Sequence, residues 1–148
     1  MTNINPYINF GGNCEEAMNF YRSVFGGEFM GPVMRWGEAP GCDEGEFKLP
    51  DDAKGKVMHM ALPISEGSVI MASDAIDGLG PKLTPGNNIA IAIGPDTREE
   101  ADRLFTGLSK GGKVQMPMAD AFWGGYFGSF EDKFGVNWLI NVEIKKED

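Results

Sequence analysis

Polar and apolar side chains alternate at the start of the chain. Over residues 4–10, one side of an extended strand would carry Ile4, Ile8 and Phe10. The opposite side would carry three polar or amphipathic side chains, Asn5, Tyr7 and Asn9. A period of two is typical of a β-strand with one buried face. The pattern therefore predicts a strand whose polar face borders a wet cleft.

Apolar residues then recur at helical spacing. They are Ala17, Phe20, Tyr21 and Val24. Asn13 stands three residues before Glu16, which is typical of a capping box at a helix N-terminus, and Gly26-Gly27 ends the pattern. The sequence predicts an amphipathic helix over residues 14–25 that covers one face of a sheet.

The rest of the first half has strand-like runs separated by glycine-rich segments. The runs cover residues 28–36, 57–64 and 68–73, and Ser65-Glu66-Gly67 provides a turn between the last two. Residues 37–56 are rich in Gly, Pro, Asp and Glu and show no periodicity, so we expect a long loop there. Residues 78–86 contain two prolines and read as a linker.

The second half repeats this plan. Glu15-Glu16-Ala17 recurs as Glu99-Glu100-Ala101, the cap position Asn13 recurs as Thr97, and the turn glycine Gly67 recurs as Gly135. The recurrence predicts a second helix near residues 98–110 within the same order of strands. We therefore expect an α+β fold of two tandem βαβββ units, about 1–76 and 86–148. Together they would form one domain with a cleft-bearing, half-open sheet.

An aromatic and glycine-rich stretch spans residues 116–141. It contains Phe122, Trp123, Tyr126 and Phe127, separated by Gly124, Gly125 and Gly128. Glycines within strands often mark places where another group approaches the backbone, so these aromatics could form the floor of a ligand cleft. The alternative is that they are core aromatics that pack for ordinary reasons.

Charge and composition exclude several classes of function. The formal net charge is -9, and no local cluster of Lys or Arg offsets it, which argues against binding to nucleic acid or to an anionic membrane. No apolar run is long enough to span a membrane, and the N-terminus does not resemble a secretion signal. The two cysteines, Cys14 and Cys42, have no metal-ligand spacing and are expected to be free thiols in a reducing cytoplasm.

Few side chains offer catalytic chemistry. The single histidine, His59, is either a hydrogen-bonded residue on a sheet face or a cleft residue that contacts ligand. Asp74 and Asp120 could act as an acid/base pair, although both positions are also typical of solvated turns. The acidic residues of the long loop could form a lid or simply keep the chain soluble; they are Asp43, Glu44, Glu46, Asp51 and Asp52.

Three segments resemble a known family. They are NFYRSVFGGEF after the first strand, the runs VMHMAL and IMASD, and above all FWGGYFGSFEDKFGVNWLIN. They closely resemble the PhnB-like branch of the glyoxalase/bleomycin resistance (vicinal oxygen chelate) superfamily, and the resemblance covers nearly the whole chain. It implies paired βαβββ units that curl around a cleft and usually assemble as a homodimer. This branch often carries a methyltransferase label, but the sequence has no strand-GxGxxG-helix unit, so we expect no nucleotide-like cofactor.

The resemblance also says where metal ligands would stand. The superfamily's metal enzymes use His, Gln or Glu at four symmetric positions, which fall here near Asn5/Pro6, near Asn88/Ile89, and at Met71 and Leu139. Amides, a thioether and an alkyl group are poor ligands for zinc, iron or nickel. We therefore expect neither a metal nor another cofactor.

The sequence favours a small-molecule binder of unassigned activity. We expect a hydrophobic or aromatic ligand in the cleft, and the candidate ligand-binding residues are Tyr7, His59, Met71, Ser73, Phe122, Trp123 and Leu139. The alternative is a metal-independent or atypical enzyme that acts on a small organic substrate, as a lyase, isomerase or dioxygenase-like relative. An enzyme would need ionisable groups that converge in the cleft.

Overall fold

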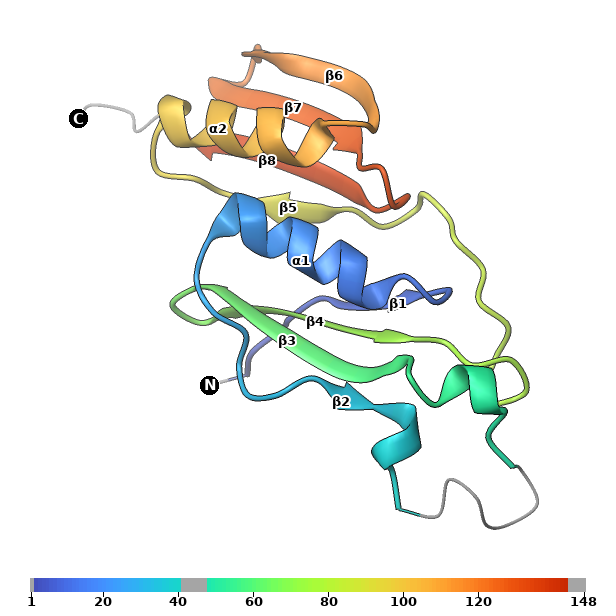
Figure 1. The fold of residues 1–148 in the computed structure, drawn as a ribbon. Helices are drawn as coiled ribbons and strands as arrows, with labels where there is room; N and C mark the ends of the chain where they lie inside the picture. Colours follow the sequence, from blue (N-terminus) through green and yellow to red (C-terminus); the bar gives the residue numbers. More distant parts are fainter. Residues whose placement is uncertain (1, 41–47, 144–148) are drawn as a thin grey trace. The chain divides into compact units, whose positions relative to one another are not determined.

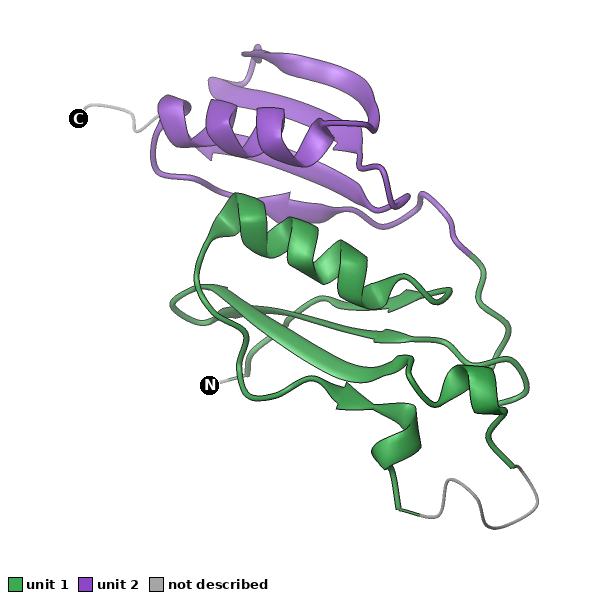
Figure 2. Cartoon of the chain, in the orientation of Figure 1, with its two compact units in different colours: residues 1–84 green, residues 85–148 purple. Residues whose placement is uncertain are grey.

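The computed structural model describes residues 2–40 and 48–143. The chain divides into two compact units, Met1–Thr84 and Pro85–Asp148, which are coloured separately in Figure 2. Cys42, Asp43, Glu44 and Glu46 lie outside the described residues, so the expectations about that thiol and most of the acidic loop concern positions that the structure does not describe.

The first unit contains one four-stranded sheet and one long helix (Figure 1). Its elements are β1 (Tyr7–Phe10), α1 (Cys14–Phe25), β2 (Met34–Arg35), the 3-10 helices η1 (Trp36–Glu38) and η2 (Asp51–Ala53), β3 (Val57–Ser65) and β4 (Ser68–Asp74). The strand order is β1-β4-β3-β2. Strand β1 runs parallel to β4, and the other neighbours are antiparallel.

The second unit follows the same plan. Its elements are β5 (Ile91–Ile93), α2 (Arg98–Ser109), β6 (Lys113–Asp120), β7 (Gly125–Glu131) and β8 (Asn137–Glu143). The strand order is β5-β8-β7-β6, and β5 runs parallel to β8. The α+β fold with two tandem βαβββ units is therefore confirmed. The turn glycines Gly67 and Gly135 have φ angles of 83° and 87°, as tight hairpins require.

Each unit buries its helix against one face of its own sheet. Helix α1 buries Cys14, Ala17, Met18 and Tyr21. Helix α2 buries Ala101, Leu104 and Leu108, and the sheet side of that core contains Phe130, Trp138 and Ile140, all fully buried. Because side chains alternate along a strand, the opposite face of each sheet is left open for other contacts.

The predicted strand over residues 28–36 is wrong in extent. Only Met34–Arg35 forms a strand beside β3, with a register shift between these two residues, and one further backbone bond runs from Met30 N–H to the Ala61 oxygen of β3. Pro32 has no N–H to donate, and Gly31 has a φ angle of 72°, which interrupts extended backbone. Within the loop predicted over residues 37–56, the described part includes the 3-10 helix η2, and Leu49, Ala53 and Ile76 form a small core against Trp36.

The two helices begin in different ways. The predicted side-chain cap by Thr97 is confirmed, because its hydroxyl accepts from the backbone N–H of Glu100 at 3.1 Å. The predicted cap by Asn13 is wrong, because its side chain makes no cap hydrogen bond. Instead Asp74 Oδ1 accepts from the N–H groups of Gly12 and Cys14, at 3.0 and 2.9 Å. Strand β4 therefore supplies the cap of α1.

Candidate functional site

Three of the predicted ligand-binding residues share the open face of the first sheet. The strand register pairs Tyr7 with Met71 and Asn9 with Ser73. Since paired residues point to the same side of a sheet, these four side chains lie on the face opposite α1. Ser73 is buried, Met71 is half-buried, and Tyr7 and Asn9 are exposed.

His59 joins this face from β3. It is half-buried, pairs with Met34 on β2, and its ring centroid lies 5.9 Å from that of Tyr7 at a tilt of 32°. This distance is typical of an aromatic contact. The structure therefore groups Tyr7, His59, Met71 and Ser73 on one sheet face, as a cleft residue set would require.

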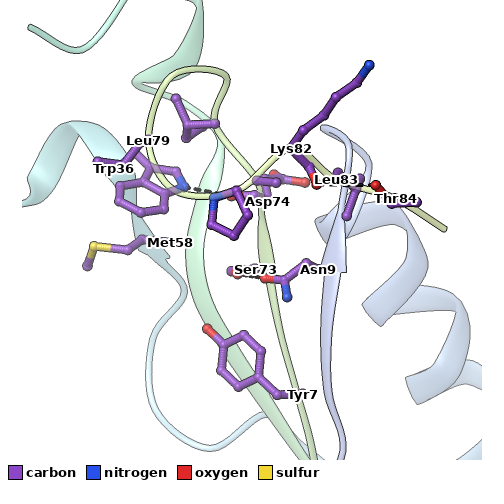
Figure 3. A pocket seen from close by; sticks show the side chains of 13 residues that line it. Tyr7, Asn9, Trp36, Met58, Ser73, Asp74, Leu79, Lys82, Leu83 and Thr84 are labelled. Carbon is purple, nitrogen blue, oxygen red and sulfur yellow. Dashed lines mark hydrogen bonds between the residues drawn. The ribbon is translucent and has the colours of Figure 1, made fainter. Parts of the chain in front are cut away.

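A pocket of about 510 Å³ opens at one end of this face (Figure 3). Strand β1 contributes Tyr7 and Asn9, and β4 contributes Ser73 and Asp74. The remaining walls come from η1, β3 and the segment after β4, and they include Trp36, Met58, Ile76, Leu79, Leu83 and Thr84. Most of these side chains are aromatic or aliphatic, so the pocket suits an apolar ligand.

Hydrogen bonds fix two of the polar groups of the pocket, which also has Lys82 and Thr84 in its wall. Ser73 Oγ donates to Asn9 Oδ1 at 3.1 Å, and Trp36 Nε1 donates to the backbone oxygen of Asp74 at 3.0 Å, both drawn in Figure 3. These bonds hold the Asn9 amide and the Trp36 indole in defined orientations. Asn9 keeps its amide N–H₂ donors for a ligand oxygen.

The two carboxylates considered as an acid/base pair both have structural partners. Asp74 is buried and accepts three backbone N–H bonds, from Gly12, Cys14 and Val57. Asp120 pairs with the guanidinium of Arg98. A carboxylate whose lone pairs are already engaged is a poor general base.

Cys14 does not suit nucleophilic chemistry either. Cys14 is the first residue of α1, and its side chain is fully buried. Burial, followed by the nearby charges of Asp74 and Glu15, raises the pKa of the thiol to about 12. Because the thiolate is the reactive form, this cysteine is inert at neutral pH.

The open face of the second sheet carries Leu139 and Asn141. Leu139 pairs with Ala92 and with Ser129, and Asn141 pairs with Phe127. A pocket of about 410 Å³ adjoins this face and is bordered by Ala92, Gly94, Asp96, Asn141 and Glu143. By the recurrence along the chain, Leu139 stands where Met71 stands in the first unit, and Asn141 where Ser73 stands.

Phe122 and Trp123 project from the connection between β6 and β7. Phe122 is 98% exposed and Trp123 is 55% exposed. The rings of Phe122 and Trp123 meet edge to face at 5.1 Å, and those of Trp123 and Phe127 at 5.7 Å. These three aromatics form a continuous cluster, and their role in a ligand cleft stays a prediction.

Tyr126 does not belong to that cluster. It alternates with Phe127 along β7 and so points to the helix side, where its hydroxyl donates to Asp102 Oδ1 at 2.6 Å. Arg98 lies over its ring at 4.6 Å. The hydrogen bond to Asp102 raises the pKa of Tyr126. Tyr126 therefore connects β7 to α2 through its contacts with Asp102 and Arg98.

The superfamily's metal positions do not fit a metal in this chain. Across residues 2–40 and 48–143 no group of three or more His, Cys, Asp or Glu side chains is arranged to hold an ion. The late positions carry the thioether of Met71 and the alkyl chain of Leu139, which do not replace imidazole or carboxylate ligands.

A methyl-donor cofactor does not fit the strand-helix turn of the first unit. The residues between β1 and α1 are Gly11, Gly12 and Asn13. In nucleotide-binding folds the N–H groups at such a turn face the cofactor. Here those of Gly12 and Cys14 are bound to Asp74.

Several pocket residues were not predicted as ligand-binding. Trp36, Met58, Leu79 and Leu83 line the first pocket, and they come from segments read as loop, linker or ordinary strand. Asn9 was detectable, because it lies on the polar side of the first strand pattern. Asn141 was detectable as the counterpart of Ser73 in the second half.

None of the helices in the described part of the chain is long and apolar enough to cross a membrane.

Comparison with known proteins gives consistent relatives. Residues 2–141 match the family described as 3-demethylubiquinone-9 3-methyltransferase. Protein YjdN of Escherichia coli K12 is 34% identical over 147 residues, with 94% of each chain covered. Protein PA1353 of Pseudomonas aeruginosa is 36% identical, with a TM-score of 0.81 over 97% of this chain and 98% of that chain.

Two further structures share this fold. A putative 3-demethylubiquinone-9 3-methyltransferase, the PhnB protein of Bacillus cereus, is 28% identical, with a TM-score of 0.70 over 95% of this chain and 99% of that one. A glyoxalase/bleomycin resistance protein/dioxygenase family enzyme of Burkholderia phytofirmans shares the fold, with a TM-score of 0.60 at 16% identity over 93% and 97% of the two chains. The chain therefore belongs to the family described as 3-demethylubiquinone-9 3-methyltransferase, and its fold is that of glyoxalase/bleomycin resistance proteins.

Proposed function

We propose that this protein binds a small hydrophobic or aromatic molecule without a metal. The observation that supports the proposal is the pocket of about 510 Å³ on the open face of the first sheet. Its volume is within the range of ordinary ligand sites, and its wall combines aromatic and aliphatic side chains with a fixed polar pair, Asn9 and Ser73. Stacking against Tyr7 or Trp36 would supply most of the affinity, and the Asn9 amide would orient the ligand.

The alternative function is a metal-independent enzyme. Catalysis would require ionisable groups with shifted pKa values that converge on the pocket. Hydrogen bonding to Arg103 lowers the pKa of Glu100, and bonding to Asp102 raises the pKa of Tyr126, but both contacts belong to α2 and its sheet. Cys14 is buried behind the first sheet. These positions favour binding over catalysis, and the same reasoning argues against methyl transfer.

Titration with N-phenyl-1-naphthylamine, a neutral aromatic probe that fluoresces on binding, tests the proposal. We expect Tyr7→Ala to weaken probe binding by about 1–3 kcal/mol, because a ring that stacks on the ligand is lost. Val114→Ala provides a control, since this side chain is half exposed on β6 and lies in the other unit. Equal affinities for the parent, Tyr7→Ala and Met58→Ala would contradict the proposed pocket.

Two further predicted ligand-binding residues, Trp123 and His59, can be tested by fluorescence titration as well. Trp123 lies in the second unit and does not line this pocket, so Trp123→Ala should cost about 1–3 kcal/mol only for a probe that stacks on its indole at a separate place. His59→Ala should cost less, because His59 is half-buried and contacts the ring of Tyr7.

Elemental analysis tests the metal-free part of the proposal. We expect no stoichiometric transition metal and no isomerisation of hemithioacetals, a reaction that uses a metal to polarise vicinal oxygens. One zinc or nickel per chain, lost in His59→Ala, would overturn this part.

Assembly as a homodimer in the cytoplasm is also our proposal. The family resemblance supports it, and so do exposed edge strands, which a partner chain would cover. Light scattering at micromolar concentration should give twice the mass of one chain, and a monomer mass would contradict it.

A further inference from the structure

The carboxamide oxygen of Asn141 is buried without a hydrogen-bond partner. It lies on β8, on the open face of the second sheet, and its Oδ1 has no hydrogen-bond partner among the described residues. Leaving a buried acceptor unpaired is unfavourable, and nearly all such groups in folded proteins have a partner. This atom is therefore a position where a donor from outside the chain would be stabilised.

Gly125 creates the space beside that oxygen. A Cβ placed on Gly125 would lie 2.6 Å from Asn141 Oδ1 and 2.8 Å from Trp123 Nε1. The amide oxygen and the indole nitrogen thus both lie close to the Gly125 backbone, and a Cβ there would require these side chains to shift. Gly125 has no positive φ angle, so close approach rather than backbone conformation explains the glycine.

An exposed aromatic cluster lies next to this oxygen. Trp123 contacts both Phe122 and Phe127, and Phe127 is the strand neighbour of Asn141. Rings as exposed as Phe122 and Trp123 are unusual unless they meet a ligand or a partner. Asn141 also borders the pocket of about 410 Å³ on the same unit.

The charges around this pocket select against anions. Asp96 and Glu143 both line it, and the whole chain carries a net charge of -9. A carboxylate or phosphate on the ligand would meet like charge, whereas a neutral N–H or O–H group would not.

We propose that Asn141, Trp123 and Phe127 form a second binding subsite, which takes a neutral planar aromatic compound with an N–H or O–H donor. The donor pairs with Asn141 Oδ1, and the ring packs against the indole of Trp123 and the ring of Phe127. Because the oxygen has no solvent contact, side chains beside it, the indole of Trp123 among them, would move aside to admit the ligand. This subsite goes beyond the proposed function, because it belongs to the second unit and does not depend on the pocket of the first.

Indole and 1-methylindole are suitable probes for this subsite, because they share a ring and differ in the N–H donor. Calorimetric titration should show that indole binds about threefold to tenfold more tightly than 1-methylindole, which corresponds to one neutral hydrogen bond. Asn141→Ala should abolish this preference. Asn141→Asp keeps an acceptor at the same place and should retain it. Gly125→Ala fills the space and should weaken both probes.

Two controls separate this proposal from the first pocket and from misfolding. Tyr7→Ala should leave the preference for indole unchanged, even if it lowers total binding in the other unit. If Asn141→Ala does not fold, the side-chain amide resonances of Asn141 in the parent protein should still shift with indole more than with 1-methylindole. Equal affinity of the parent for the two probes, a preference that survives Asn141→Ala, or equal shifts would each overturn the proposal.

Discussion

The two units share one topology but are held together by different buried aspartates. In the first unit Asp74 joins three segments that are distant in sequence, because it accepts from Gly12 and Cys14 at the start of α1 and from Val57 at the start of β3. In the second unit Asp132 binds its own hairpin, with bonds from the N–H groups of Phe134 and Val136 and from Trp138 Nε1.

The comparison shows that a repeated fold does not require repeated contacts. Both aspartates place a carboxylate where three N–H groups need an acceptor, and each does so at a different corner of the βαβββ plan. Asp74 closes the helix onto the sheet, whereas in the second unit the helix cap comes from the adjacent Thr97. The first unit therefore depends on long-range contacts that the second replaces with local ones.

The open sheet faces of the two units also carry different side chains. Ser73 in the first unit has a partner in Asn9, but its counterpart Asn141 in the second has none. At the position of Tyr7 on β1, strand β5 carries the small side chain of Ala92. The exposed aromatic rings of the second unit come instead from the β6–β7 connection.

The largest expected effect is on the reactivity of Cys14, the first residue of α1. Helix α1 begins with the buried Cys14, and α2 begins with the exposed Arg98. Because the pKa of Cys14 rises from 9.0 to about 12, its thiolate fraction at pH 8 should fall about 1,000-fold below that of an ordinary cysteine. Alkylation by iodoacetamide, read at this residue by peptide mass spectrometry, should be slower in the native chain by at least that factor than in urea.

The raised pKa of Cys14 also sets the direction of its pH dependence. The unfolded thiol ionises near pH 9 and the folded one near 12, so this residue's contribution to stability is fully present below pH 9 and declines as the pH rises toward 12. Cys14→Ala should flatten the fall in stability over that interval. Equal alkylation rates in native and unfolded chains would show that the start of α1 is not buried.

The next largest effect separates the two aspartates. Asp74→Asn turns an acceptor into an N–H₂ group that faces another donor, and should lower the free energy of unfolding by about 3 kcal/mol. Asp132→Asn should cost about 2 kcal/mol, because backbone bonds between Asp132 and both Val136 and Gly135 still close the turn. Urea denaturation monitored by circular dichroism measures both, with the exposed Asp52→Asn as the matched control.

Hydrogen exchange locates these losses. Asp74→Asn should speed exchange at the amides of Cys14 and Val57, which belong to different elements, whereas Asp132→Asn should speed exchange only near its hairpin. Indistinguishable exchange patterns for the two variants would remove the distinction between long-range and local anchoring.

Sequence patterns predicted the elements whose signals are local. The helices over 14–25 and 98–110, the two turn glycines and the recurrence of the plan all depend on spacing within one segment, and the structure matches them closely. Strand β2 was overpredicted, because apolar composition does not show that Gly31 and Pro32 interrupt the pairing. The role of Asp74 as a cap was not predictable, since its three partners are distant along the chain.

The part of the candidate site that lies on strands was predictable from the sequence, and the part on irregular segments was not. Tyr7, Met71 and Ser73 could be grouped because alternation along paired strands fixes the face of each side chain. Trp36, Leu79 and Leu83 could not, because they come from irregular segments whose path depends on tertiary contacts. Tyr126 was assigned to the aromatic floor on composition, and the alternation of β7 places it on the helix side.

The smallest expected effect tests the origin of the two helix caps. Thr97→Ala removes the hydroxyl that accepts from the N–H of Glu100 and should cost about 1 kcal/mol of stability, as loss of a side-chain cap usually does. Asn13→Ala should change stability by less than about 0.5 kcal/mol, since the side chain of Asn13 makes no cap bond and Asp74 accepts from the first turn instead. Thermal unfolding of both variants measures the difference, and the exposed Thr84→Ala controls for loss of a threonine elsewhere. A cost for Asn13→Ala equal to that for Thr97→Ala would mean that α1 is capped locally after all. The long-range role assigned to Asp74 would then fail with it.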